Sequence, residues 1–263
     1  MIAAGKSAPC TETSMIPDAL TATLAAAQSV CVLTGSGVSA ESGVPTFRDA
    51  QTGLWAKFQP EALATPEAFQ RNPSLVWEWY EWRRKLLRQA RPNAAHSALA
   101  ELEQIFPRFS LISQNVDGLH QAAGSKNMIE FHGNIMRTIC SAEGCVVEEY
   151  DAGESPPPCP RCGAYLRPDV VWFGEQIDKD ALAAAIAYAG ACDVFFAIGT
   201  SAQVQPAAGL ADLAMQSGAC MIEINPQQTP LSDRASYALR GNAARLLPAL
   251  VRALRECMRE REQ

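Results

Sequence analysis

Short apolar runs alternate with longer segments of helical periodicity along most of the chain. Runs typical of buried strands occur at residues 30–33, 109–113, 194–198 and 221–224. Strands that alternate with helices form a parallel sheet with helices on both faces, so the pattern predicts an α/β fold. Helices are expected at residues 17–27, 94–105, 178–189, 206–218 and 246–258.

Two stretches depart from this alternation and predict a smaller second domain. Residues 55–90 contain four of the five tryptophans and two helix starts, in which a proline follows Thr65 or Asn72. Residues 139–166 contain few apolar residues. Because neither stretch can bury a core alone, we expect one small lobe with a helical part (55–90) and a metal-binding part (139–166). The large domain is then expected to comprise residues 15–54, 91–138 and 167–263.

Composition and charge exclude several classes of protein. The chain has 263 residues, 48% of them hydrophobic, which suits one large domain with a smaller insert. Its net charge is -6 and its basic residues form no long block, so nucleic acid is not an expected partner. No run approaches the roughly 18 to 20 apolar residues that cross a bilayer, and no membrane is expected.

Four of the nine cysteines cluster in a pattern typical of a metal site. Cys140 and Cys145 are followed, after thirteen intervening residues, by Cys159 and Cys162. Four thiolates are a ligand set of tetrahedral structural zinc, and we expect one such ion. The alternative is two chance pairs of reduced cysteines. The other five are scattered, which indicates a reducing compartment and a cytoplasmic location. The oligomeric state stays open, a monomer included.

A loop rich in glycine and serine follows the first predicted strand. It runs from Gly35 to Arg48. A dinucleotide-binding fold places its phosphate loop at this point, where backbone N–H groups can approach a pyrophosphate. The glycine spacing differs from the usual Gly-x-Gly-x-x-Gly, and a plain strand-to-helix turn is the alternative. The position of the loop favours a Rossmann-like sheet.

Polar residues also follow the second predicted strand. Gln114, Asn115 and Asp117 come directly after it, at the carboxyl end, where α/β sheets bind ligands. The chain has three histidines, so the search for a general base is short. His96 is expected to pack on a helix, and His120 is expected to be structural. His132 lies in a non-helical turn and is the candidate base.

These motifs together resemble those of the sirtuins, which are NAD-dependent protein lysine deacylases. The resemblance extends to the four cysteines and to residues 168–175, 199–206 and 224–225, so it covers nearly the whole chain. Two residues depart from the family pattern. Ser36 stands where alanine is common, and Phe131 stands where leucine is usual.

The resemblance implies an NAD site and a reaction. The acyl oxygen of a modified lysine would attack the anomeric carbon of the nicotinamide ribose, and His132 would activate the ribose 2′-hydroxyl as general base. Asn115 and Asp117 would be the other catalytic residues. The products would be nicotinamide, O-acyl-ADP-ribose and free lysine. The implied NAD-binding residues are Gly35, Ser36, Gly37, Ser39, Ala40, Glu41, Ser42, Gly43, Pro45, Thr46, Phe47, Arg48, Gln114, Asn115, Val116, Asp117, Gly199, Thr200, Ser201, Asn225, Pro226, Gln227 and Ala243.

The resemblance also places an acylated protein lysine beside residues 171–175. Val171, Phe173, Gly174 and Glu175 would pair as a strand with the substrate peptide. Main-chain pairing of this kind recognises little of the peptide sequence.

The pair Tyr80 and Arg83 bears on the choice of acyl group. The two residues are three apart on a predicted helix and therefore share a face. A guanidinium and a phenol can bind a carboxylate together. The alternative is that Tyr80 packs and Arg83 is solvated. The pair resembles the signature of sirtuins that remove succinyl and malonyl groups, so we expect both of these activities beside deacetylation.

Three other functions compete with this interpretation. Mono-ADP-ribosyl transfer would use the same NAD site with a side-chain nucleophile. A non-catalytic NAD-sensing or zinc-binding module would be expected to lose Asn115, Asp117 or His132, and all three are present. A hydride-transferring dehydrogenase is disfavoured by the spacing of the glycine loop.

Overall fold

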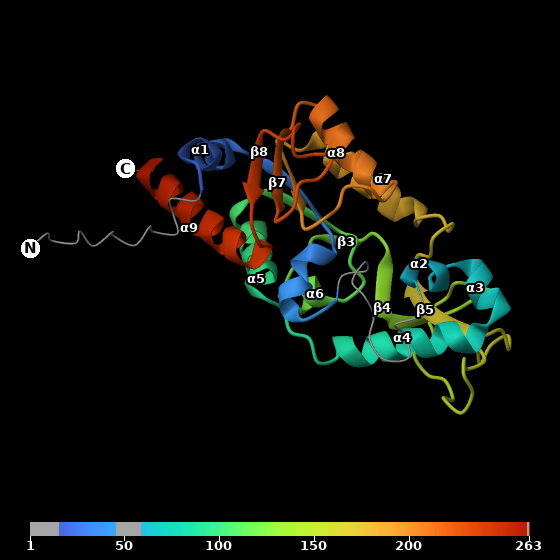
Figure 1. Ribbon diagram of the computed structural model, residues 1–263. Helices are drawn as coiled ribbons and strands as arrows, with labels where there is room; N and C mark the ends of the chain where they lie inside the picture. The colour runs from blue at the N-terminus through green and yellow to red at the C-terminus, as the bar shows by residue number, and fades with distance from the viewer. Residues whose placement is uncertain (1–15, 46–58, 262) are drawn as a thin grey trace, which may run out of the picture.

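The structure, a computed structural model, describes residues 16–45, 59–261 and 263. It is built around a sheet of six strands, all parallel, in the order β3-β2-β1-β6-β7-β8. Figure 1 labels β3, β7 and β8 of this sheet. The strands are β1 (Ser29–Thr34), β2 (Arg108–Ser113), β3 (Met128–Glu130), β6 (Val194–Ile198), β7 (Cys220–Asn225) and β8 (Tyr237–Arg240). The strand order reverses between β1 and β6, as in a Rossmann-like sheet, and the expected fold class is confirmed.

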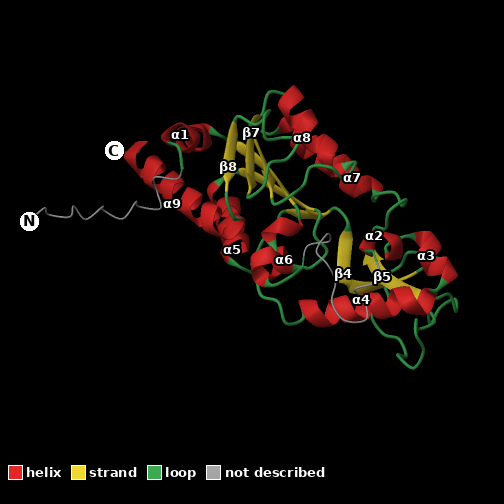
Figure 2. Ribbon diagram, in the orientation of Figure 1, coloured by secondary structure: helices red, strands yellow, loops and turns green. Residues whose placement is uncertain are grey.

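Helices cover both faces of this sheet (Figure 2). One face carries α1 (Asp18–Ala26), α5 (Ala94–Ile105) and α9 (Ala243–Arg261), and the other carries α7 (Lys179–Ala191) and α8 (Ala207–Gln216). Successive side chains of a strand point to opposite faces, so Val32 packs with the first group and Leu33 with the second. Burial on both sides explains why the strands are continuous apolar runs in the sequence.

Local capping fixes where two of these helices begin. The Asp178 side chain accepts hydrogen bonds from the N–H groups of Asp180 and Ala181 at the start of α7. Asn93 caps α5, and the His96 ring accepts a hydrogen bond from the Asn93 N–H at 3.2 Å. Strands β3 and β8 are only 3 and 4 residues long and are not among the strands that the sequence predicts.

A smaller group of elements packs beside the large sheet and has its own core. It comprises helices α2 (Pro60–Leu63), α3 (Pro66–Arg71) and α4 (Pro73–Leu87) and the antiparallel strands β4 (Gly133–Cys140) and β5 (Leu166–Val170). Phe69, Trp79 and Trp172 belong to that core. The expected domain bounds at 138/139 and 166/167 fall within β4 and β5, whose pairing continues across them. The division into two domains stays a prediction.

The buried side chain of Arg84 joins α4 to β4. It is 3% exposed, and its guanidinium donates to the carbonyl oxygens of Ile135 at 2.6 Å and Arg137 at 2.8 Å. An ion pair with Glu81 at 2.7 Å compensates the buried charge. Because β4 begins directly after His132, these bonds hold the helix that carries Tyr80 and Arg83 next to the candidate base.

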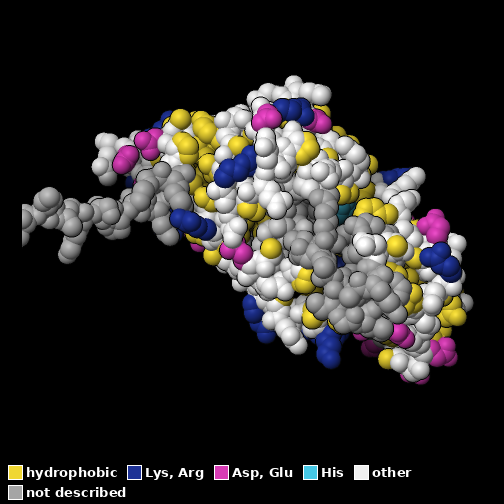
Figure 3. Space-filling view, viewed as in Figure 1, with side chains coloured by type: hydrophobic (Ala, Val, Ile, Leu, Met, Phe, Trp, Pro, Cys, Tyr) yellow, Lys and Arg dark blue, Asp and Glu magenta, His cyan; other side chains and the backbone are white. Residues whose placement is uncertain are grey.

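The surface carries charged side chains of both signs. On the face shown in Figure 3, Lys and Arg side chains lie scattered among Asp and Glu side chains. Within residues 16–45 and 59–261, no helix combines the length and the apolar character needed to cross a bilayer.

Candidate active site

A cavity of about 1100 Å³ lies at the carboxyl ends of β1 and β6, where the strand order reverses. It is lined by the loop after β1, by residues 114–117, by His132, by residues 170–177 and by the loops after β6 and β7. Parallel sheets bind dinucleotides in this place. The three polar segments that the sequence singles out therefore meet around one space.

The floor of the cavity is a contact between two backbones. The N–H of Gly37 donates to the carbonyl oxygen of Gly199 at 2.9 Å, and the N–H of Gly35 donates to that of Ile198 at 3.0 Å. A Cβ at Gly37 would lie 2.8 Å from Gly199 Cα. Gly199 has φ +59°, and a Cβ there would lie 2.5 Å from the backbone nitrogen of Val38. Only glycine allows this approach.

The amide and carboxylate residues after β2 are tied to the same loop. Asn115 Nδ2 donates to Ser39 Oγ and to the carbonyl oxygen of Gly35, both at 3.1 Å. Ser39 Oγ donates to Asp117 Oδ2 at 2.7 Å. Gln114 Nε2 donates to Thr200 Oγ1 at 3.0 Å. These bonds fix the orientation of the polar groups along one wall of the cavity.

The hydrogen bond of His132 determines which ring nitrogen is basic. Its Nδ1 lies 3.0 Å from the carbonyl oxygen of Gln114. A carbonyl only accepts, so Nδ1 carries the proton and Nε2 keeps its lone pair. Burial lowers the pKa of His132 below the usual 6.5, and the bond to Gln114 opposes this only in part. A neutral ring with a free Nε2 lone pair can accept a proton at neutral pH.

The other two histidines lie together behind Ser39. Their ring centroids are 4.8 Å apart, and His96 Nε2 lies 3.4 Å from Ser39 Oγ. His120 Nε2 lies 3.0 Å from Thr34 Oγ1, and burial, followed by the charge of His96, lowers the pKa of His120 to about 3. Sequence reasoning gave His96 only a packing role. The contact with Ser39 joins positions 57 apart, and no local signal announces it.

The loop after β7 and the start of α9 form the far end of the cavity. Asn225 Nδ2 donates to the carbonyl oxygen of Thr200 at 2.8 Å. Glu41 accepts a hydrogen bond from the N–H of Ala244 at 3.1 Å, which joins the glycine loop to α9. The remaining predicted NAD-binding residues that line the cavity are Ser36, Ala40, Pro45, Val116, Ser201, Pro226, Gln227 and Ala243.

Part of the predicted NAD-binding set does not line this cavity. Ser42 and Gly43 are absent from its wall, and Ser42 Oγ accepts a hydrogen bond from Asn93 Nδ2 at 3.0 Å. Ser42 thus connects the glycine loop to the cap of α5. Thr46, Phe47 and Arg48 lie outside the described residues.

Tyr80 and Arg83 of α4 line the same cavity as His132. The Tyr80 hydroxyl accepts a hydrogen bond from Trp172 Nε1 at 2.9 Å, and the Arg83 guanidinium lies 5.0 Å from the ring centroid of Trp79. Burial raises the pKa of Tyr80 to about 12, although Arg83 opposes the shift. The cavity therefore contains a neutral phenol beside a guanidinium.

Residues 171–175 form a narrow turn beside these side chains. The N–H of Val171 donates to the carbonyl oxygen of His132 at 3.0 Å, and the N–H of Phe173 donates to that of Ala64 at 2.9 Å. Both carboxylate oxygens of Glu175 accept from Arg167, at 2.6 and 2.9 Å. The carboxylate of Glu175 is thus paired inside the protein, whereas Phe173 is 44% exposed.

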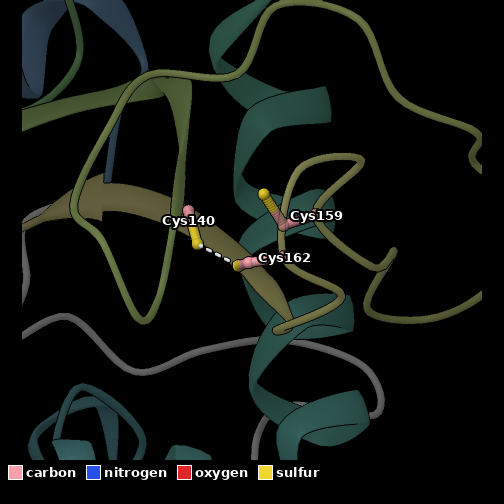
Figure 4. Close-up of side chains that lie close together, drawn as sticks. All are labelled: Cys140, Cys159 and Cys162. Carbon is pink, nitrogen blue, oxygen red and sulfur yellow. Dashed lines mark hydrogen bonds between the residues drawn. The ribbon is translucent and has the colours of Figure 1, made fainter.

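The predicted zinc cysteines lie together at the ends of β4 and β5. Cys140, Cys159 and Cys162 have sulfur atoms within 4.8 Å of one another, and Cys140 forms a second group with Glu143 and Cys145. Cys140 and Cys162 point toward each other with their sulfurs 3.4 Å apart (Figure 4). Reduced thiols at this spacing fit tetrahedral zinc. Such an ion would link the turn that contains Cys140 and Cys145 to the turn that contains Cys159 and Cys162, in a segment with a small core.

The sheet and the cavity define a class of α/β proteins that bind a dinucleotide where the strand order reverses. The model of the Sir2 family matches residues 35–206, and the chain belongs to the Sir2 family. The expected sirtuin resemblance is thereby confirmed.

Several known proteins are similar to the chain over nearly their whole length. A protein of Aquifex aeolicus named NAD-dependent protein deacylase is 51% identical over 229 residues, which cover 86% of this chain and 95% of the relative. A solved complex of a Sir2 homolog with NAD has a TM-score of 0.87 and a sequence identity of 45%. The match covers 92% of this chain and 95% of the homolog's chain. A substituted Sir2 homologue with 2′-O-acetyl ADP ribose has a TM-score of 0.86 at 46% identity, covering 92% and 98%.

We expect the cysteine cluster to hold one zinc ion per chain, and removal of the ion to destabilise the lobe. Cys162→Ser should lower the melting temperature and the bound zinc measured by elemental analysis, because three thiolates bind the ion less tightly. Cys257→Ser on α9 is the control and should change neither. Freshly purified wild-type protein without metal would contradict the assignment.

Proposed function

We propose that this NAD-dependent protein deacylase removes acetyl, succinyl and malonyl groups from lysine. From NAD, an acylated lysine and one water molecule, its products are nicotinamide, O-acyl-ADP-ribose and free lysine. The observation that carries the proposal is the single cavity that joins the glycine loop, His132 and the Tyr80/Arg83 pair. The deacylase name of a relative and the NAD and 2′-O-acetyl ADP ribose complexes of neighbours support it.

In this proposal the glycine loop and the strand-end residues bind NAD. The backbone and hydroxyl of Ser36 would face the pyrophosphate. The N–H groups of Gly35 and Gly37 and the Ser39 hydroxyl are bonded inside the protein and shape the loop around it. Gln114, Asn115 and Asp117 hold the nicotinamide and its ribose, and the loops after β6 and β7 hold the adenosine. The cavity is lined by polar side chains at these positions, and its floor is formed by glycine residues, so a phosphate can approach closely.

His132 is the proposed general base. Its Nδ1 is engaged by the Gln114 carbonyl, so Nε2 is the nitrogen that takes the proton of the ribose 2′-hydroxyl. The acyl oxygen of the modified lysine first attacks the anomeric carbon as nicotinamide leaves. The deprotonated 2′-oxygen then attacks the acyl carbon, the lysine amine leaves with the proton, and one water completes O-acyl-ADP-ribose. Asn115 and Asp117 orient the reacting groups, and the bonds of both to Ser39 keep them in position.

The proposed partner is the acylated lysine of another protein. Residues 171–175 border the cavity, and the exposed side chain of Phe173 offers a contact to an extended peptide. The N–H groups of Val171 and Phe173 are already bonded inside the protein. The lysine then enters beside His132, with its acyl group toward Tyr80 and Arg83. The scattered reduced cysteines favour a cytoplasmic location.

Mass spectrometry of matched acetyl-, succinyl- and malonyl-lysine peptides, with and without NAD, tests the function. All three peptides should lose their acyl mass only when NAD is present. Nicotinamide release should require an acyl peptide. Release without any acyl peptide, together with an ADP-ribose adduct on protein, would favour mono-ADP-ribosyl transfer instead.

We expect His132→Ala to abolish deacylation while leaving NAD affinity nearly unchanged, because a general base acts in the transition state. In the wild type, activity needs the neutral ring, and its pKa is lowered. The midpoint of the acid limb in a plot of kcat/KM against pH should therefore lie below pH 6.5, the usual pKa of histidine. Activity of His132→Ala within a few-fold of wild type would contradict the assignment.

We expect Arg83→Met to lower kcat/KM for a succinyl peptide by at least about tenfold, because a partly buried carboxylate loses its charged partner. Acetyl-lysine has no such carboxylate and should be affected much less. Tyr80→Phe should act in the same direction with a smaller effect, since one neutral hydrogen bond is lost.

Arg88→Met provides a matched control, because Arg88 is exposed at the end of α4 and does not line the cavity. It should leave the preference between the two peptides unchanged. Equal losses for both peptides in Arg83→Met would show that the pair is structural.

A further inference from the structure

Trp172 contacts the hydroxyl of Tyr80 through the only polar hydrogen of its side chain. The indole is 2% exposed, and Nε1–H donates to the Tyr80 hydroxyl oxygen at 2.9 Å. The two rings are stacked, with centroids 6.3 Å apart and an interplanar angle of 28°. Trp172 lies between the predicted substrate residues Val171 and Phe173, in the run expected to pair with the peptide, and the sequence assigns it no role of its own. Because an indole can only donate, the Tyr80 oxygen must be the acceptor.

The indole is held firmly on its other sides. The Arg167 guanidinium lies 3.3 Å from the ring centroid, and the Phe69 ring packs against it at 5.2 Å. Arg167 is bound to Glu175, which also accepts the Trp172 backbone N–H at 2.8 Å. Rotation of the indole would break the stack with Arg167, so the direction of its N–H is fixed.

This contact decides what the Tyr80 hydroxyl can offer to a ligand. A hydroxyl has one proton and accepts through its lone pairs. Because Trp172 donates to a lone pair of the Tyr80 oxygen, the Tyr80 proton is directed away from Trp172. Tyr80 lines the cavity beside Arg83. Arg83 is also a pure donor. The two side chains therefore present donors, which match the oxygens of a carboxylate and have no counterpart in an acetyl methyl group.

We propose that Trp172 is a positioning residue that determines acyl specificity by holding the Tyr80 hydroxyl as a donor toward the terminal carboxylate of an acidic acyl group. The inference rests on the proposed removal of succinyl and malonyl groups. It adds a third member to the Tyr80/Arg83 pair, supplied by the segment that binds the peptide. Recognition of the peptide and of the acyl group are thereby joined in one turn of the chain.

The substitution Trp172→Phe tests this role, because it keeps an aromatic ring and removes the N–H. We expect kcat/KM for a succinyl peptide to fall about three- to tenfold, as for one lost hydrogen bond, mainly through KM. kcat/KM for the matched acetyl peptide should fall less than kcat/KM for the succinyl peptide, so the succinyl-to-acetyl ratio falls. The ratio within one preparation does not depend on the fraction of folded protein. Trp172→Met, which fills the space without a polar hydrogen, is a second variant.

A double-mutant cycle separates this role from simple packing. If Trp172 acts through the Tyr80 hydroxyl, Trp172→Phe should not lower the succinyl-to-acetyl ratio further in a Tyr80→Phe background. If Trp172 had a purely structural role, its substitution would lower kcat/KM for both peptides equally in either background. Trp77→Phe is the control, since Trp77 packs on Tyr150 and does not line the cavity, and it should leave the ratio unchanged.

The outcomes distinguish this inference from the proposed function. Wild-type protein that removes acetyl but not succinyl or malonyl groups would overturn the acidic-acyl part of the proposed function, and the role of Trp172 with it. Wild-type protein that removes succinyl groups, combined with an unchanged ratio in Trp172→Phe and Trp172→Met, would overturn the role of Trp172 alone.

Discussion

The loop after β1 and the loop after β6 touch through their backbones, and the rest of the site depends on that contact. Gly37 and Gly199 leave no room for a Cβ between them. The close approach brings the amides of the glycine loop to the place where the strand order reverses. It also sets the Gly35 carbonyl and Ser39 where Asn115 can bind both. A larger residue would push the loops apart and open every one of these bonds.

The chemistry of the site is divided between the sheet and the smaller core. The sheet supplies the glycine loop and the polar strand ends, while α4 and the turn after β5 supply Tyr80, Arg83 and Trp172. His132 stands at the junction, just before β4, and Arg84 holds α4 to that strand. Cavity walls from both parts therefore keep a fixed spacing, as a reaction between a dinucleotide and an acyl-lysine requires. A zinc ion on the cysteine cluster would hold together the far end of the same small part.

Periodicity and the positions of the strand ends were enough to predict the layered sheet and the gathering of the polar segments at the carboxyl ends of its strands. The Asp178 cap and the meeting of residues 114–117 with the glycine loop obey rules of local geometry and of parallel sheets. Strands β3 and β8 could not be predicted, because they are too short to form apolar runs. The Trp172–Tyr80 bond joins positions 92 apart, and the use of Glu175 by Arg167 likewise depends on the folded turn. Contacts of this kind arise from packing and carry no local signal.

Calorimetric titration of NAD into Gly199→Ala tests the central claim most directly. Gly218→Ala is the matched control, since Gly218 also has positive φ but a Cβ there would meet nothing within 4 Å. Both variants should lose about 1 kcal/mol of stability from the left-handed backbone. Gly199→Ala should in addition weaken NAD binding by at least about tenfold, or 1.4 kcal/mol, whereas Gly218→Ala should bind as wild type does. Equal NAD affinity in the wild type and both variants would contradict the view that the glycine contact builds the site.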